Sequence, residues 1–395
     1  MLLEPADPNE RFRSRRRQAR RRRAARRTAV LGVVALAAAA VALGASFLHG
    51  KGKAAEGDRA GGARQNSTAP AKPEPRPLPD EIRGVHVTMA LASLDGKLHE
   101  YFGLTAQGLN TLELDVKDEN GEVGFRRPQV ALARRVGAAR PYYNPYRAAT
   151  AAHAHGLYLI GRIVVFEDPI LSQARPKLAI RRADGGVWTT SSGLGWVNPY
   201  DKRVWKYNVD LAEAAVTAGF DEIMFDYVRF PTDGDVSSAV FSGRRSEPKA
   251  ATISRFLEYA RSRLEPRGAR LSAAVFGLSA TREMGIGQRP RRLAPYLDSI
   301  YPMVYPSHYG AGEYDLPDPN AVPGITVARS LRDFRRALRG RTTLLVPWLQ
   351  DFSLGREYVP ADVRAQIQSA RDLDAKGFLL WNPSGVYTPS ALAGR

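Results

Sequence analysis

The sequence contains no cysteine among its 395 residues. Disulfide bonds, a thiolate nucleophile and zinc sites built on cysteine are therefore excluded. No glycine-rich phosphate loop follows the first strand-like segment, residues 82–89, and residues 192–195 lack the nucleophile-elbow pattern of serine hydrolases. His153 and His155 are two positions apart on a predicted helix and point in different directions, which does not suit a shared metal ion. We therefore expect no cofactor and no metal site.

Acidic residues are absent from residues 11–27, which hold eleven arginines, and charged residues are absent altogether from residues 28–48. A helix of 28–48 is long enough to cross a hydrocarbon core of about 30 Å. Arginines before such a helix favour a cytoplasmic N-terminus. We therefore predict a cytoplasmic Arg-rich tail over 1–27, a lipid-embedded anchor over 28–48, and an extracytoplasmic main domain. A cleaved signal peptide is the alternative, and it would secrete the same domain.

Residues 49–80 are rich in Gly, Ala, Pro and Lys and show no apolar period, which predicts a flexible linker before a domain over 81–395. The formal net charge is +18; the first 27 residues hold eleven arginines and three acids and so contribute +8, leaving +10 elsewhere. Such a charge also occurs in nucleic-acid-binding proteins. Because a membrane anchor explains the densest cluster, we expect no nucleic-acid partner.

Short apolar or β-branched segments alternate with helical patterns through the main domain. The expected strands are 82–89, 111–116, 157–166, 222–227, 271–276, 299–304, 343–349 and 377–381. The expected helices include 202–218, 253–264, 327–338 and 361–376. Strands that alternate with helices indicate a parallel sheet, and eight strands close the common (β/α)8 TIM barrel. An open doubly wound sheet is the alternative, but the missing phosphate loop disfavours it.

Carboxylates and aromatic rings gather where the expected strands end, which is where these barrels place catalytic groups. Acidic side chains that catalyse cleavage of a glycosidic bond, together with flat rings that stack on sugars, are typical of proteins that act on carbohydrates. The candidate substrate-binding residues are Lys117, Asp118, Arg162, Asp168, Tyr227, Arg229, Tyr305, His308, Trp348, Gln350, Trp381 and Asn382.

Alternation along the second strand predicts that Glu113, Asp115 and Lys117 face the barrel lumen. Arg162 interrupts an apolar run in the third strand, and a buried arginine needs an acid partner, for which Asp226 and Asp115 are the candidates. A purely structural layer of ion pairs at the barrel mouth is the alternative.

Asp226, at the end of the fourth strand, is our choice for the principal catalytic carboxylate, as nucleophile or transition-state stabiliser. Asp351 and Asp115 are equal candidates for the second carboxylate, and Glu283 ranks below them. A carboxyl separation of about 5 to 5.5 Å would indicate retention of configuration, and about 6.5 to 9.5 Å inversion.

Several motifs resemble those of a bacterial family of TIM-barrel domains that was long without an assigned function and is described as glycoside hydrolases on the basis of its fold. The matching motifs lie at 114–118, 162–166, 185–188, 196–200, 225–231, 303–309, 347–352 and 380–382. The resemblance covers nearly all of 82–388. The family usually has Lys where this chain has Glu167 and Arg where it has Val346.

The resemblance and the strand ends together predict a glycoside hydrolase or transglycosylase that acts on a cell-surface or extracellular polysaccharide. A non-catalytic carbohydrate-binding barrel in the cell envelope is the alternative from another class. A polysaccharide deacetylase is disfavoured, because no metal-ligand pattern accompanies the carboxylates.

Overall fold

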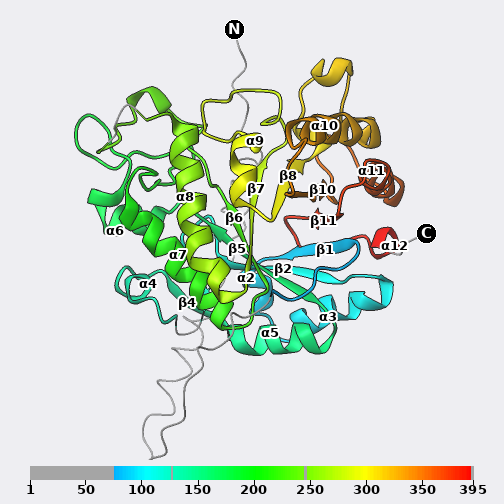
Figure 1. Ribbon diagram of the computed structural model, residues 1–395, viewed down its shortest axis with the longest axis horizontal. Coiled ribbons are helices and arrows are strands. Elements are labelled where there is room, and N and C mark those ends of the chain that lie inside the picture. Colours follow the sequence, from blue (N-terminus) through cyan, green and yellow to red (C-terminus); the bar gives the residue numbers. More distant parts are fainter. Residues whose placement is uncertain (1–74, 126–127, 244–246, 393–395) are drawn as a thin grey trace, which may run out of the picture. The chain divides into compact units, whose positions relative to one another are not determined.

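The computed structural model describes residues 75–125, 128–243 and 247–392 (Figure 1). The predicted tail, anchor and most of the linker, residues 1–74, lie outside the described residues, so the membrane anchor at 28–48 stays a prediction. Within the described ranges, no helix is both long and apolar enough to cross a bilayer.

The described residues form a closed barrel of eight parallel strands, which confirms the predicted barrel. The strands are β1 (Ile82–Val87), β2 (Thr111–Lys117), β5 (Tyr158–Val164), β6 (Glu222–Asp226), β7 (Arg270–Phe276), β8 (Ser299–Val304), β10 (Trp348–Gln350) and β11 (Gly377–Trp381). Neighbouring strands pair in chain order, and β1 closes the barrel by pairing with both β2 and β11. All eight therefore end at the same rim.

Two parts of the sheet differ from the prediction. The seventh strand is interrupted, because β9 (Leu344–Leu345) and β10 are separated by Val346 and Pro347, and proline has no N–H for a ladder bond. The segment after β2, where the sequence predicted no strand, contains β3 (Val123–Phe125), antiparallel to β2, and β4 (Ala139–Tyr143), parallel to β3. These two short strands extend the sheet beyond the barrel.

Helices cover the outside of the barrel (Figure 1). The longer ones are α5 (Pro145–Ala154), α7 (Lys202–Thr217), α8 (Lys249–Leu264), α10 (Pro323–Ala337) and α11 (Pro360–Asp372). The shorter ones are α2 (Met89–Ala92), α3 (Lys97–Gly103), α4 (Ala131–Arg135), α6 (Pro169–Ala174), α9 (Pro290–Leu293) and α12 (Pro389–Leu392). Many begin with proline, whose fixed φ suits the first helical position and whose missing N–H is not needed there.

The barrel interior is polar near the amino-terminal ends of the strands. Glu222 on β6 is fully buried and accepts a hydrogen bond of 3.1 Å from the Tyr158 hydroxyl. Burial raises the pKa of Glu222 to about 7, although hydrogen bonds from Ser272, Tyr301 and Tyr158 oppose the shift. The outward side chains of the strands are apolar, as Leu112 and Leu114 of β2 show by their near-complete burial.

Candidate active site

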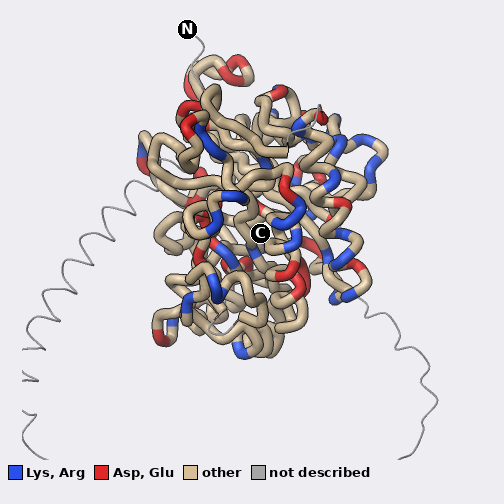
Figure 2. Tube along the Cα trace, turned by 90° about the vertical axis from the view of Figure 1, so that its left-hand side faces the viewer, with Lys and Arg blue, Asp and Glu red and all other residues tan. Residues whose placement is uncertain are grey.

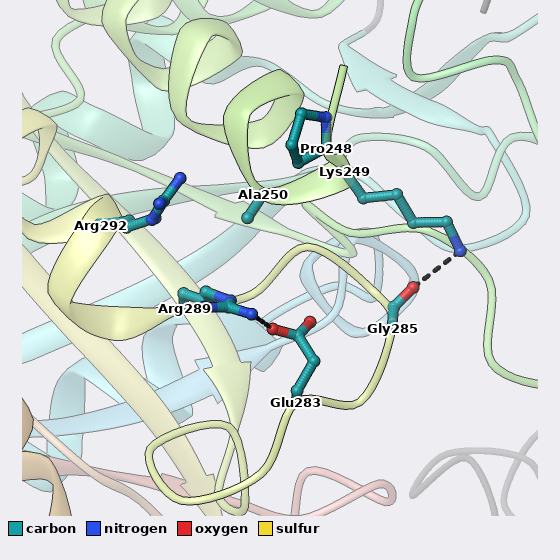
Figure 3. A pocket seen from close by; sticks show the side chains of 7 residues that line it. All are labelled: Pro248, Lys249, Ala250, Glu283, Gly285, Arg289 and Arg292. Carbon is teal, nitrogen blue, oxygen red and sulfur yellow. Dashed lines mark hydrogen bonds and ion pairs between the residues drawn. The ribbon is translucent and has the colours of Figure 1, made fainter. Parts of the chain in front are cut away.

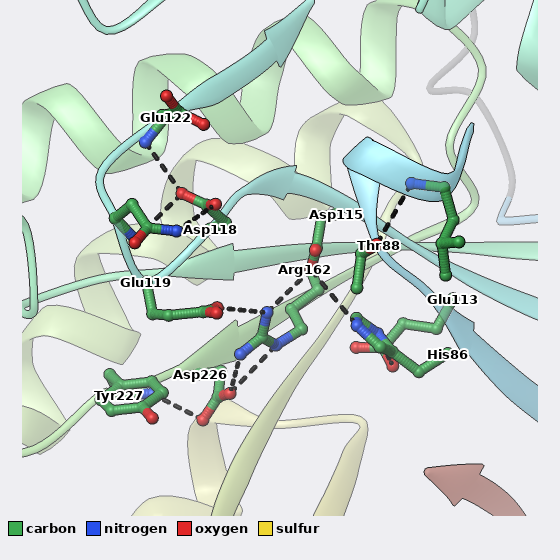
Figure 4. A network of polar contacts seen from close by, with 12 residues as sticks. His86, Thr88, Glu113, Asp115, Asp118, Glu119, Glu122, Arg162, Asp226 and Tyr227 are labelled. Carbon is green, nitrogen blue, oxygen red and sulfur yellow. Dashed lines mark hydrogen bonds and ion pairs between the residues drawn. The ribbon is translucent and has the colours of Figure 1, made fainter. Parts of the chain in front are cut away.

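Arg162 of β5 is the centre of a buried ion network at the upper part of the barrel (Figure 4). Its Nε and Nη2 atoms lie 3.0 and 2.6 Å from Asp226 Oδ2, and its Nη1 lies 2.7 Å from Asp115 Oδ1. The strands set this geometry, because Asp115 is in register with Arg162 and Asp226 is in register with Val164, on the two flanking strands. Arg162 thus pairs with both of the acids proposed from the sequence.

The charge of Arg162 is stabilised by its partners rather than by solvent. Arg162 is 6% exposed, and Asp115 and Asp226 are 2% and 1% exposed. Burial by itself lowers the pKa of Arg162, but the carboxylates of Asp226 and Asp115 outweigh burial and raise it well above its ordinary value. Breaking such a buried pair leaves an uncompensated charge and costs far more than losing a surface pair.

One guanidinium bridges the two carboxylates and therefore limits their separation. The two Nη atoms of an arginine are about 2.3 Å apart, so the bonded oxygens of Asp226 and Asp115 are at most about 8 Å apart. Two-carboxylate glycosidases use separations of about 5 to 9.5 Å. The bridge therefore places Asp115 no farther from Asp226 than the upper limit of this range.

Three further side chains extend the network, and none of them was a candidate site residue from the sequence. They are those of His86, Glu113 and Glu119. His86 Nδ1 lies 3.1 Å from Glu113 Oε2, and His86 Nε2 lies 3.7 Å from Asp115 Oδ1. Burial raises the pKa of Glu113, with His86 opposing the shift. Glu119 Oε2 lies 3.7 Å from Arg162 Nη1. The Glu119 side chain is 14% exposed, against 2% for Asp226, and so reaches solvent best among the acids paired with Arg162.

The sequence carried a signal for two of these residues, because Glu113 shares the parity of Asp115 in β2 and Glu119 follows the strand end by two residues. His86 lies beside Glu113 only through the pairing of β1 with β2, which the sequence does not show.

Asp118 holds the turn that carries Glu119. Its carboxylate accepts hydrogen bonds from the backbone N–H groups of Asn120 and Glu122, at 3.0 and 2.9 Å, and from the Asn120 side chain at 2.7 Å. Burial, and next the charge of Glu119, raise the pKa of Asp118 to about 8. Asp118 therefore contacts its own loop, and its predicted contact with substrate stays a prediction.

Lys117 does not share the lumen face with Asp115, so the expected alternation is wrong at this position. The register between β2 and β5 shifts between Asp115 and Lys117. Lys117 Nζ instead lies 2.8 Å from Asp168 Oδ2 and 2.9 Å from Asn208 Oδ1 of α7. Asp168 also accepts a hydrogen bond of 2.8 Å from the N–H of Leu171 at the start of α6. Lys117 and Asp168 thus form a buried structural pair beside the site.

The backbone is strained next to Asp226. Tyr227 has a φ of 50°, which is rare for a bulky residue, and its N–H donates a bond of 2.7 Å to Asp226 Oδ1. Strain of this kind collects at functional sites. Arg229 lies over the rings of Trp196, Tyr227 and Phe276 at 5.0, 5.0 and 4.6 Å and is 1% exposed. Tyr227 therefore contacts Asp226 directly, and Arg229 contacts the ring of Tyr227.

Aromatic rings from the last strands border the network. The Trp348 ring lies 5.9 Å from the Arg162 guanidinium carbon, and Tyr305 stacks on Trp381 at 5.2 Å. Burial, and next the charge of Asp226, raise the pKa of Tyr305 well above its ordinary value. The Tyr305 hydroxyl and Trp348 Nε1 are buried without a hydrogen-bond partner among the described residues. Both groups are hydrogen-bond donors, and neither atom is open to solvent in this structure.

The other candidate carboxylates have different partners. Both oxygens of Asp351 accept bonds of 2.7 Å from Thr388, one from its N–H and one from its hydroxyl. The side-chain amide of Asn382 donates to the Asp351 carbonyl oxygen. Glu283 is exposed and pairs with Arg289 in the loop after β7. The structure therefore favours Asp115 over Asp351 and Glu283 as the acid next to Asp226.

Gln350 and His308 link the loops of the rim. The Gln350 side chain donates to the Phe352 carbonyl at 2.9 Å and accepts from the Ser307 N–H at 3.1 Å. His308 Nδ1 lies 3.0 Å from the Ser307 hydroxyl, and its ring meets Phe352 edge-on at 6.0 Å. In the part of the chain that is described, no group of three or more His, Asp or Glu side chains is arranged to hold a metal ion.

A parallel barrel with a bridged carboxylate pair and aromatic rings at its rim is typical of glycoside hydrolase barrels. Residues 84–387 match a family described as a "putative glycosyl hydrolase domain", and the chain belongs to that family. This membership confirms the resemblance seen in the sequence motifs and makes the domain glycosidase-like. No protein with a curated function matches the sequence.

Two solved glycosidase structures share the barrel fold, and a third solved structure is similar in sequence. The glycoside hydrolase domain of PgaB (BpsB) from Bordetella bronchiseptica is 14% identical, with 79% of this chain and 95% of that one covered and a TM-score of 0.53. The α-galactosidase TtGalA of Thermus thermophilus, in complex with stachyose, is 15% identical, with 82% and 67% covered and a TM-score of 0.51. A hypothetical protein from Ruminiclostridium thermocellum is 36% identical, with 48% and 96% covered and a TM-score of 0.44.

Proposed function

We propose that this protein is a glycoside hydrolase or transglycosylase of a polysaccharide, with Asp226 as its principal carboxylate. The observation that carries the proposal is the bridge from Arg162 to Asp226 and Asp115, at the rim where barrel enzymes place their chemistry. Arg162 fixes the orientation of Asp226 and supports its negative charge. Such a carboxylate either attacks the anomeric carbon or stabilises the positive charge that develops on the sugar.

The second carboxylate must exchange a proton with the leaving-group oxygen or with water. Asp115 lies close enough to Asp226, but Arg162 and His86 both contact its Oδ1 atom. Glu119 has the longer contact with Arg162 and the more exposed side chain. Proton transfer needs a group that substrate and water can reach. Glu119 is therefore our first choice for the acid and base, and Asp115 the second.

The aromatic side of the site is suited to a sugar ring. Trp348, Tyr305 and Trp381 present rings near the network, and apolar ring faces stack on pyranoses. The Tyr305 hydroxyl and the Trp348 indole N–H add two buried donors for sugar hydroxyls. A polymer with many hydroxyls would satisfy both donors in the bound state.

We place the substrate at the cell surface, because the arginine-rich stretch and the uncharged segment 28–48 favour an anchored, extracytoplasmic domain. Protease added to intact cells stripped of their wall should then release the domain. Survival of the full-length chain on such cells would contradict this location.

A carbohydrate-binding barrel without catalysis is the second candidate. It is favoured by the burial of Asp226 and Asp115 and by their pairing with one arginine. Both features are also typical of ion pairs that serve only to stabilise the fold. The two functions differ in one respect, since only the enzyme needs a carboxylate that exchanges protons.

The deciding experiment is a screen of the purified full-length chain against wall and capsular glycans, with reducing ends and glycan binding measured together. For an enzyme, Asp226→Asn and Glu119→Gln should each lower turnover by about 10²- to 10⁴-fold. Asp210→Asn, on the outer surface of α7, is the matched control and should keep full turnover. Binding without turnover, equal in all four proteins, would refute the enzyme and support the binding barrel.

A further inference from the structure

A concave site separate from the candidate active site lies at the start of α8 (Lys249–Leu264), where this helix meets the loop after β7 (Figure 3). This pocket has a volume of about 380 Å³. It is lined by Pro248, Lys249, Ala250, Glu283, Gly285, Arg289 and Arg292. None of these residues belongs to the network around Arg162.

The lining of the pocket is strongly basic. Three cations, from Lys249, Arg289 and Arg292, face one carboxylate, from Glu283, so the lining carries an excess of two positive charges. Glu283 pairs with Arg289, and both side chains are about half exposed, at 47% and 52%. Lys249 Nζ donates a bond of 2.8 Å to the Gly285 carbonyl, which fixes the ammonium at the edge of the pocket.

The charge of the pocket differs from that of the candidate active site. On the face seen in Figure 2, basic and acidic residues are interspersed. The network around Arg162 has the opposite character, with Glu113, Asp115, Glu119 and Asp226 outnumbering their cationic partners. The pocket and the candidate active site would therefore attract groups of opposite charge.

The first turn of α8 strengthens the attraction. The helix has 16 residues, begins at Lys249, and has Pro248 as its N-cap, which offers no side-chain acceptor to the first N–H groups. Helix N-termini favour anions, because their N–H groups lack intrahelical partners and the helix dipole is positive there. Ala250, 7% exposed, lies in this turn and against the pocket.

Hydrogen bonds connect the pocket loop to the rim of the barrel that carries Asp226. The Phe230 N–H, four residues beyond Asp226, donates a bond of 2.9 Å to the Ile286 carbonyl in the pocket loop. The Gln288 side chain accepts from the Phe276 N–H at 3.0 Å, which fixes the same loop to the end of β7. Hydrogen bonds therefore hold the pocket loop in place rather than leaving it to close on a ligand.

We propose that this pocket binds an anionic group of the phosphate or carboxylate class. The cations of Arg292 and Lys249 and the first turn of α8 supply the binding charge, and Glu283 weakens the site because it neutralises Arg289. The anion is either a free oxyanion or a substituent on a polymer. The site is independent of the glycosidase proposal, because it uses no residue of the Arg162 network.

Calorimetric titration of the full-length chain with inorganic phosphate, at an ionic strength held constant with chloride, tests the site. Arg292→Gln should weaken phosphate binding about threefold to fivefold, the effect expected for one exposed ion pair. Glu283→Gln should strengthen binding by a similar factor, because it releases Arg289 to the ligand. An increase in affinity cannot result from misfolding.

Arg291→Gln is the matched control, because Arg291 is the neighbour of Arg292 on α9 and contacts the carbonyls of Ala337 and Arg339 instead.

A second titration uses a phosphate-bearing wall polymer and the same polymer after dephosphorylation. Tighter binding of the phosphorylated polymer than of inorganic phosphate identifies a polymer-borne ligand, and equal binding identifies the free anion. Equal phosphate affinity in the wild type, Arg292→Gln and Glu283→Gln would overturn the proposal.

Discussion

Glu222 should make the stability of this barrel depend on pH in a way that one substitution removes. The side chain is fully buried, and burial raises its pKa from an ordinary 4.5 to about 7. A carboxyl whose folded-state pKa is raised stabilises the fold fully below its unfolded pKa, and that contribution disappears as pH rises through the folded value. The free energy of unfolding of the wild type should therefore fall between pH 4.5 and pH 7.

The size of the effect follows from the shift. Each unit of pKa corresponds to about 1.4 kcal/mol, so the wild type should lose about 3 kcal/mol of unfolding free energy across this window, relative to Glu222→Gln. Gln keeps the shape and can still accept the Tyr158 hydroxyl, but it does not titrate. Asp118, with a pKa of about 8, titrates in both proteins, so its contribution cancels in the comparison.

Urea unfolding of both proteins at pH 4, 5.5, 7 and 8 measures the difference. We expect the gap between wild type and Glu222→Gln to change by about 3 kcal/mol in favour of the variant as pH rises. Glu258→Gln, an exposed substitution on α8, is the matched control. A gap that stays constant from pH 4 to 8 would refute the assignment of a raised pKa to Glu222.

Three further substitutions test the ion pairs and the rim. Arg162→Met should cost about 3 to 5 kcal/mol in chemical denaturation, because two buried carboxylates lose their cation, and adding Asp226→Asn should recover part of the loss. Lys117→Met should cost a similar amount through Asp168, and equal stability of variant and wild type would contradict a buried pair. Trp348→Phe removes the indole N–H and should weaken glycan binding about threefold to tenfold, as calorimetry would report, and should also lower stability because the smaller ring leaves a cavity at a buried position.

The strands could be placed from the sequence because each is a short apolar or β-branched run between helical patterns. The partners of Arg162 could be predicted for a related reason, since a buried arginine in a strand needs an acid on a neighbouring strand. Both inferences use information local to one segment or to adjacent strands. They required no knowledge of loops.

Register and loop contacts could not be predicted in the same way. The bulge that turns Lys117 away from the lumen depends on how two strands pair, and one strand does not encode it. Asp351 ranked equal to Asp115 because both lie near the carboxyl end of a strand, and only the later segment with Thr388 shows where the Asp351 carboxylate is held. Pro347 was a visible signal that the seventh strand breaks, since proline rarely occupies a central strand.

The turn between β2 and β3 has a consequence for how Glu119 is presented. The connection is only residues 118–122, closed by a hydrogen bond of 3.0 Å from the Asp118 N–H to the Glu122 carbonyl. Gly121 has a φ of 76°, and a side chain at that position would collide with Asp168. The turn is therefore packed closely against Asp168, which Lys117 pairs with. The short turn and its hydrogen bonds hold Glu119 in one place, so substrate would meet an acid already in position.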